Sequence, residues 1–152
     1  KETSSYNINN ETINFFLNEE KKYNLNKAKT YLDFYERIKK HKKDIESFFS
    51  YANEERKKVY GIGASTKGNV LLQYNQIPKN KIKEIGEVNE DKYGCVTPGT
   101  KIPINDENII LSKKPDYLFI LPWHFRTFFE SSQKFKGFKL VFPLPDFNIK
   151  QL

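Results

Sequence analysis

The stretch "VYGIGASTKGN", Val59–Asn69, decides the fold class because it joins a strand to a helix through a glycine turn. The apolar residues of "KKVYGIG" indicate the strand, and "GNVLLQYNQI" indicates the short helix that follows. Further along, "KIKEIGEVNE", "PDYLFILP" and "GFKLVFPLP" are typical of strands. The segment "DKYGCVTPGTKIPIND" is typical of a loop, and "WHFRTFFESSQKF" of a helix with Phe125, Phe128 and Phe129 on its buried side.

This alternation of strands and helices predicts an α/β domain of the Rossmann-like, three-layer kind, with helices on both faces of a mostly parallel sheet. We place it at residues 57–152. Residues 1–10, "KETSSYNINN", are polar and aperiodic, which indicates a linker or the tail of an upstream domain.

Residues 11–56 are predicted to form helices that pack on the sheet. A first helix is expected in "ETINFFLNEEKKYN", and a long one over about Thr30–Glu55. The apolar residues that share one face are Ile13, Phe16 and Leu17 in the first helix, and Tyr31, Phe34, Ile38, Ile45, Phe48, Phe49 and Ala52 in the second.

The composition bounds the class of protein. Of 152 residues, 38% are hydrophobic and 30% are charged, which suits a globular domain rather than a disordered chain. No apolar run approaches the roughly 20 residues needed to cross a bilayer. We therefore expect a cytoplasmic protein without a membrane partner. Cys95 is the only cysteine, so an intrachain disulfide and a structural zinc site are both excluded.

The net charge of +7 raises the question of a nucleic-acid partner. Only Arg37, Arg56 and Arg126 are arginines, whereas base readout and bidentate phosphate binding favour arginine. The lysines gather in "ERIKKHKKD" and "NEERKK", interleaved with acidic residues, as on a solvated helix face. We expect no nucleic-acid partner, and we expect His41 to lie on that solvated face.

The loop in Val59–Asn69 fits neither common phosphate-loop fingerprint. The dinucleotide pattern G-x-G-x-x-G requires a third glycine where Thr66 stands, and the P-loop requires "K[ST]" where "NV" follows the last glycine. The physical features of a phosphate loop remain. Glycines permit close backbone approach, Ser65 or Thr66 can cap the helix, and free N–H groups there attract anions. Lys67 adds a mobile positive charge. The alternative is a tight turn without a ligand.

Two further segments follow predicted strands, where doubly wound sheets bind ligands. Glu87 lies 24 residues after Gly63, and an acid at such a position hydrogen-bonds a ribose in dinucleotide folds. In "LPWHF", Trp123 can stack on a base or sugar, and His124 can donate to phosphate or act as a general acid or base. The alternatives are a surface glutamate and a structural tryptophan.

The segment "TPGT", Thr97–Thr100, is typical of a compact turn, in which Pro98 fixes φ and Gly99 supplies a positive φ. A turn without a ligand is the alternative here.

Four segments, taken in order, resemble one family: "GIGASTKGNVLLQY", "EVNEDKYGCVTPGTKIPI", "PDYLFILPWHF" and "FPLPD". The family is the C-terminal domain of S-adenosylmethionine-dependent C-methyltransferases that act on nucleotide-linked sugars, including deoxysugar enzymes of antibiotic and lipopolysaccharide pathways. The resemblance covers about residues 11–150. Its most specific parts are the loops G-x-G-A-x-x-K-G-N and K-x-G-x-x-x-P-G-T.

The resemblance implies a role in substrate binding. Family enzymes have a small cysteine-rich zinc module, a methyltransferase domain, and a Rossmann-like C-terminal domain that helps bind the sugar nucleotide at the interface with the methyltransferase domain. The matching positions, implied to bind substrate, are Gly61, Gly63, Ala64, Ser65, Thr66, Lys67, Gly68, Asn69, Glu87, Lys92, Pro98, Gly99, Thr100, Trp123 and His124. Glu87, Tyr93 and His124 stand where family members commonly carry aspartate, glutamine and asparagine.

The chain contains no cysteine cluster for zinc and no glycine-rich S-adenosylmethionine loop followed by a methyltransferase domain. We therefore expect a fragment that binds substrate and is inactive alone, with no catalytic residue, metal or cofactor of its own. Its expected partners are a nucleotide-diphosphate sugar and the upstream methyltransferase domain, and S-adenosylmethionine and zinc are expected in the upstream domains. The full enzyme would deprotonate a sugar carbon next to a 4-keto group and transfer a methyl group to the carbanion.

Two other readings stay open. One is a free-standing Rossmann-like module that binds a nucleotide or NAD, and the other is a basic nucleic-acid-binding domain.

Overall fold

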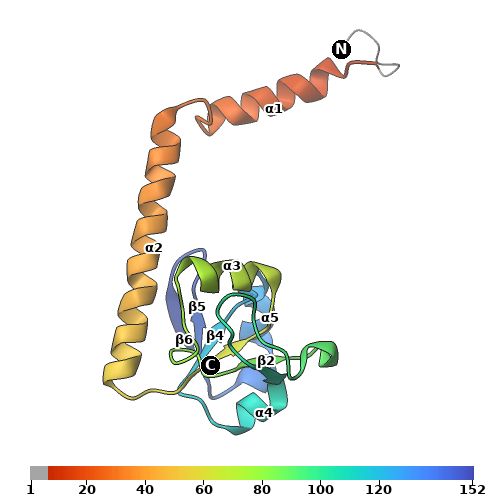
Figure 1. The fold of residues 1–152 in the computed structure, drawn as a ribbon. Coiled ribbons are helices and arrows are strands. Elements are labelled where there is room, and N and C mark those ends of the chain that lie inside the picture. Colours follow the sequence, from red (N-terminus) through yellow and green to blue (C-terminus); the bar gives the residue numbers. More distant parts are fainter. Residues whose placement is uncertain (1–6) are drawn as a thin grey trace. The chain divides into compact units, whose positions relative to one another are not determined.

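The computed structural model describes residues 7–152, which form two compact units; the first ends at Lys40 and the second is His41–Leu152. The first unit holds α1 (Asn10–Lys22) and the first part of α2 (Ala28–Glu54) (Figure 1). Asn9 caps α1, since its side chain accepts a hydrogen bond from the Thr12 N–H at 3.0 Å. Most of the large apolar side chains of this unit are exposed: Ile8, Ile13, Phe15, Phe16, Leu17, Tyr23, Leu25, Tyr31, Leu32, Phe34 and Tyr35.

The second unit is built on a six-stranded sheet with the order β3-β2-β1-β4-β5-β6. Its strands are β1 (Val59–Ile62), β2 (Ile85–Glu87), β3 (Ile104–Asp106), β4 (Tyr117–Ile120), β5 (Lys139–Phe142) and β6 (Asn148–Gln151). Neighbouring strands from β3 to β5 are parallel, and β6 pairs with β5 in the antiparallel direction. The helices are α3 (Thr66–Tyr74), α4 (Glu107–Ser112) and α5 (Arg126–Ser131), with 3-10 turns η1 (Glu90–Lys92), η2 (Trp123–Phe125) and η3 (Gln133–Phe135).

Helices cover both faces of this sheet. Along β4, successive side chains alternate between two buried clusters, as the pleat of a strand requires. Tyr117 and Phe119 join one cluster, with residues of α2 and α3, whereas Leu118 and Ile120 join the other, with residues of α4 and α5. The helix residues of the first cluster are Ile45, Phe48, Phe49, Ala52, Leu71 and Leu72, and those of the second include Ile110 and Phe129. The predicted α/β, Rossmann-like three-layer architecture is confirmed.

Two parts of the predicted pattern were wrong. The supposed loop "DKYGCVTPGTKIPIND" begins within η1 and ends in β3. The supposed helix "WHFRTFFESSQKF" is split into η2, α5 and η3, and of the three phenylalanines expected on its buried side only Phe129 is buried. Phe125 is 59% exposed and Phe128 is 61% exposed. A 3-10 turn has three residues per turn instead of 3.6, so η2 shifts the helical phase before α5 begins.

His41 is not the solvated side chain that was expected. It is partly buried, and its Nε2 lies 2.7 Å from the carbonyl oxygen of Pro143. The packing of residues 11–40 on the sheet stays a prediction, as do the proposed domain boundaries. Of the predicted linker, residues 1–6 lie outside the described residues. No helix within residues 7–152 is long and apolar enough to cross a bilayer.

Candidate functional site

The order of the strands places a topological switch point between β1 and β4. From β1 the chain moves outward to β2 and β3 on one side, and from β4 to β5 and β6 on the other. The two strands end level, because Ile62 pairs with Ile120. In open α/β sheets, ligands bind beyond the carboxyl ends of the strands at such a point. The loops that leave β1 and β4 here carry the predicted glycine and tryptophan–histidine segments.

These two loops are in close contact because glycine leaves no side chain between them. Gly63 has φ of +76°, and a Cβ added to it would lie 2.7 Å from Cδ of Pro122. A Cβ on Gly68 would lie 2.5 Å from Cβ of Leu121. Gly68 thus allows the close helix–strand packing that the third glycine provides in dinucleotide-binding folds. The G-x-G-x-x-G pattern has Thr66 in place of its third glycine, but Gly68, two residues later, allows the same close packing.

The start of α3 is capped by Ser65. Its Oγ accepts a hydrogen bond from the Gly68 N–H at 3.0 Å, and its carbonyl accepts one from the Asn69 N–H at 2.9 Å. The N–H groups of Thr66 and Lys67 have no partner within the helix, because the first turn of any α-helix leaves its N–H groups free. Both side chains are exposed. Asn69 is half-buried, and its side-chain oxygen has no hydrogen-bond partner.

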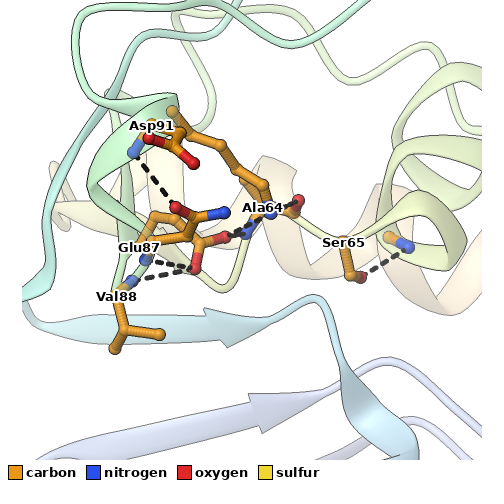
Figure 2. A network of polar contacts seen from close by, with 8 residues as sticks. Ala64, Ser65, Glu87, Val88 and Asp91 are labelled. Atoms are coloured by element: carbon orange, nitrogen blue, oxygen red, sulfur yellow. Dashed lines mark hydrogen bonds and ion pairs between the residues drawn. The ribbon is translucent and has the colours of Figure 1, made fainter.

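Glu87 clamps the loop after β1 to the loop after β2, as Figure 2 shows. It is 6% exposed, and its Oε2 accepts a hydrogen bond from the Ala64 N–H at 2.9 Å. Its Oε1 accepts from the N–H groups of Val88 at 2.8 Å and Asn89 at 3.1 Å. Lys92 completes the clamp, because its Nζ lies 3.1 Å from Oε2 of Glu87 and 3.1 Å from the carbonyl oxygen of Ala64.

The clamp favours the ionised carboxylate. Burial raises the pKa of Glu87, but the N–H groups of Asn89 and Val88 and the ammonium of Lys92 together outweigh burial, so the pKa is lowered. Both carboxylate oxygens are thereby engaged within the protein, and so is the ammonium of Lys92. Neither side chain needs a ligand to satisfy it. The role of Glu87 and Lys92 as substrate ligands stays a prediction.

The "TPGT" turn lies at the other end of α3. The carbonyl of Pro98 accepts a hydrogen bond from Nε2 of Gln73 at 3.3 Å, and a Cβ on Gly99 would lie 3.0 Å from Cδ of Gln73. Gln73 comes seven residues after Thr66, which corresponds to about 10 Å along a helix. Pro98, Gly99 and Thr100 are therefore not brought to the start of α3.

The turn itself is held by two threonines. The Oγ1 atoms of Thr97 and Thr100 lie 2.7 Å apart, and Oγ1 of Thr97 also accepts a hydrogen bond from the Ile102 N–H at 2.9 Å.

Trp123 and His124 do lie at the switch point, in η2. Trp123 is half-buried and His124 is exposed. The two rings meet edge to face at a centroid distance of 5.5 Å, and the His124 ring lies 4.3 Å from that of Phe125. The sequence did not place Phe125 beside these rings, because its spacing to Phe128 and Phe129 fits the buried face of a continuous helix.

The described part of the chain thus brings the glycine loop, the start of α3, the Glu87 clamp and the η2 aromatic residues together at one edge of the sheet. The C-methyltransferase C-terminal domain family matches residues 1–145. The chain belongs to this family.

A curated relative agrees with the assignment. C-methyltransferase NovU of Streptomyces niveus is 29% identical to this chain over 93 residues. That match covers 59% of the chain and 22% of the relative, so the chain spans about a fifth of that protein's length. The family description supports a transferase context for this domain.

Proposed function

We propose that this chain is the substrate-binding C-terminal domain of an S-adenosylmethionine-dependent C-methyltransferase that acts on a nucleotide-linked keto-deoxysugar. The close approach of Gly63 to Pro122 carries the proposal, because it joins the start of α3 to η2. A diphosphate would bind at the N–H groups of Thr66 and Lys67 with the help of the Lys67 ammonium. Trp123 and His124 would contact the sugar or the nucleoside.

In this proposal the chain supplies binding and orientation, and its partner is the methyltransferase domain of the same protein. The methyl donor S-adenosylmethionine, the catalytic acid and base groups and a zinc module would belong to the partner regions, in the cytoplasm. The domain alone would then bind the sugar nucleotide without methylating it. Removal of a proton next to the 4-keto group and transfer of the methyl group to the carbanion would need both parts.

Calorimetric titration of the 152-residue chain tests the proposal. We expect binding of a thymidine- or guanosine-diphosphate sugar and little or no binding of NADH. NADH is the proper competitor, because dinucleotide-binding folds share this switch point. Binding of NADH alone would show a dinucleotide module instead.

Lys67→Ala and Trp123→Ala should each weaken binding of the sugar nucleotide by about tenfold, the loss of one charge-assisted or stacking contact. Lys67 is exposed and Trp123 is half-buried, and the melting temperature of each variant measures whether it stays folded. Glu90→Gln, an exposed change in the neighbouring loop, is the control. Unchanged affinity in both variants would mean that the loops are only turns.

A further inference from the structure

Phe125 is an exposed aromatic residue next to the proposed site. Phe125 is 59% exposed, whereas Trp123, at the start of η2, is half-buried. The rings of Trp123, His124 and Phe125 follow one another with centroid distances of 5.5 Å and 4.3 Å. We call these three side chains the aromatic row.

The exposure of Phe125 is fixed by the packing around it. The next residue, Arg126, is held within the protein: its Nε lies 2.7 Å from Oε1 of Glu130, and its guanidinium lies 4.7 Å from the ring centroid of Phe142. Phe129, one turn further, is buried. With both residues of α5 anchored on the core side, Phe125 stays outside the core and forgoes the stabilisation of burial.

The row begins directly after Pro122, which contacts the glycine loop. The Phe125 N–H donates to the carbonyl of Pro122 at 2.9 Å, and Pro122 is the residue that packs against Gly63. The first ring of the row, Trp123, therefore follows directly after the residue that contacts the glycine loop. A ligand anchored by its diphosphate at the start of α3 would meet flat apolar surface there, beside a histidine.

We propose that the rings of His124 and Phe125 stack on the nucleobase of the ligand. This inference rests on the proposed function and says which half of the ligand lies on the row. A base is flat on both faces and gains from stacking whatever its identity. The sugar must present a carbon to a methyl donor that the partner region would hold, so its faces have to stay open to that partner. The assignment adds Phe125 to the site.

The test uses the fluorescence of Trp123, the only tryptophan in the chain, with calorimetry as a second readout. The ligands are thymidine diphosphate and inorganic pyrophosphate. We expect Phe125→Ala to weaken the binding of thymidine diphosphate by about tenfold, as for the loss of one stacked base. The affinity for pyrophosphate should be unchanged. Phe125→Tyr, which keeps the ring, should bind like the wild type.

Phe128→Ala is the matched control, because Phe128 is also an exposed phenylalanine but its ring contact is with Phe129. Its affinity for thymidine diphosphate should equal that of the wild type. Equal affinity of wild type and Phe125→Ala would overturn the inference, and so would an equal loss in Phe128→Ala or a parallel loss for pyrophosphate. If the wild type binds no nucleoside diphosphate, the proposed function itself fails.

Discussion

Gly68 has no room for a side chain. A Cβ there would lie 2.5 Å from Cβ and 3.2 Å from Cα of Leu121, so the strand end itself stands in the way. We expect Gly68→Ala to lower the free energy of unfolding by about 1–3 kcal/mol, the usual cost of overpacking. Chemical denaturation measures it, with Lys67→Ala as the exposed neighbouring control. A neutral Gly68→Ala would show that α3 can move away from β4 without cost.

Glu87 makes the stability of the loops depend on pH. Its folded-state pKa is lowered from the ordinary value of 4.5, so its contribution is present above that value and is lost as the pH falls through the folded-state pKa. Glu87→Gln would turn an amide NH2 toward backbone N–H donors and remove the ion pair with Lys92. We expect a loss of about 2 kcal/mol at pH 7.

Melting temperatures at pH 7 and pH 3 measure this effect. The difference in melting temperature between wild type and Glu87→Gln should be largest at pH 7 and should shrink below about pH 4.5. Glu90→Gln, in the same loop but exposed, should follow the wild type. A difference that does not change with pH would mean that the carboxylate charge is not what stabilises the clamp.

Among the elements, α2 contains two kinds of environment. Phe48 is 5% exposed and belongs to the core of residues 41–152, whereas Phe34, on the same helix, is 53% exposed. Phe48→Ala should therefore cost about 3–5 kcal/mol of unfolding free energy. Phe34→Ala should change it by less than about 0.5 kcal/mol. Equal losses in urea denaturation would show that the exposed half of α2 also contributes to a core.

The elements that the sequence predicted are mostly those with apolar runs. β1, β4 and β5 carry such runs, β2 lies in the segment "KIKEIGEVNE", in which apolar and polar residues alternate, and the helix α3 follows a clear strand-to-glycine signal. β3 was missed because its three residues, "IND", are mostly polar, and β6 because "NIKQ" contains one apolar residue. Both are edge strands, and sheet pairing with a neighbour rather than their own composition makes them strands.

The candidate site was predictable where backbone rules apply and not where side-chain packing decides. The glycine loop and the Ser65 cap follow from the local sequence. The hydrogen bond between the Glu87 carboxylate and the Ala64 N–H joins residues that are 23 positions apart, so local sequence rules do not predict it. The place of "TPGT" beside Gln73 depends on the path of the loop between β2 and β3, which no periodicity indicates.

At the scale of the whole molecule, the net charge of +7 is the excess of 26 lysines and arginines over 19 acidic residues, and several of the lysines are paired with those acids. Ion pairs join lysines to acidic side chains in both units: Lys22–Glu19, Lys29–Asp33, Lys39–Glu36, Lys92–Glu87, Lys113–Glu84, Lys134–Glu107 and Lys150–Glu130. We expect weak or undetectable affinity for random duplex DNA at physiological salt. Fluorescence anisotropy measures it, and tight binding with a steep salt dependence would support a nucleic-acid partner.

The position of β3 at the edge of the sheet bears on solubility. The outward N–H and C=O groups of Ile104 are not open to another chain, because its carbonyl accepts a hydrogen bond from the Gly94 N–H at 3.0 Å and its N–H donates one to the Cys95 carbonyl at 2.9 Å. Exposed edges of sheets are templates for joining strands of different molecules into aggregates. The loop folded against Ile104 takes up these two groups, which would otherwise be open for pairing with a strand of another copy.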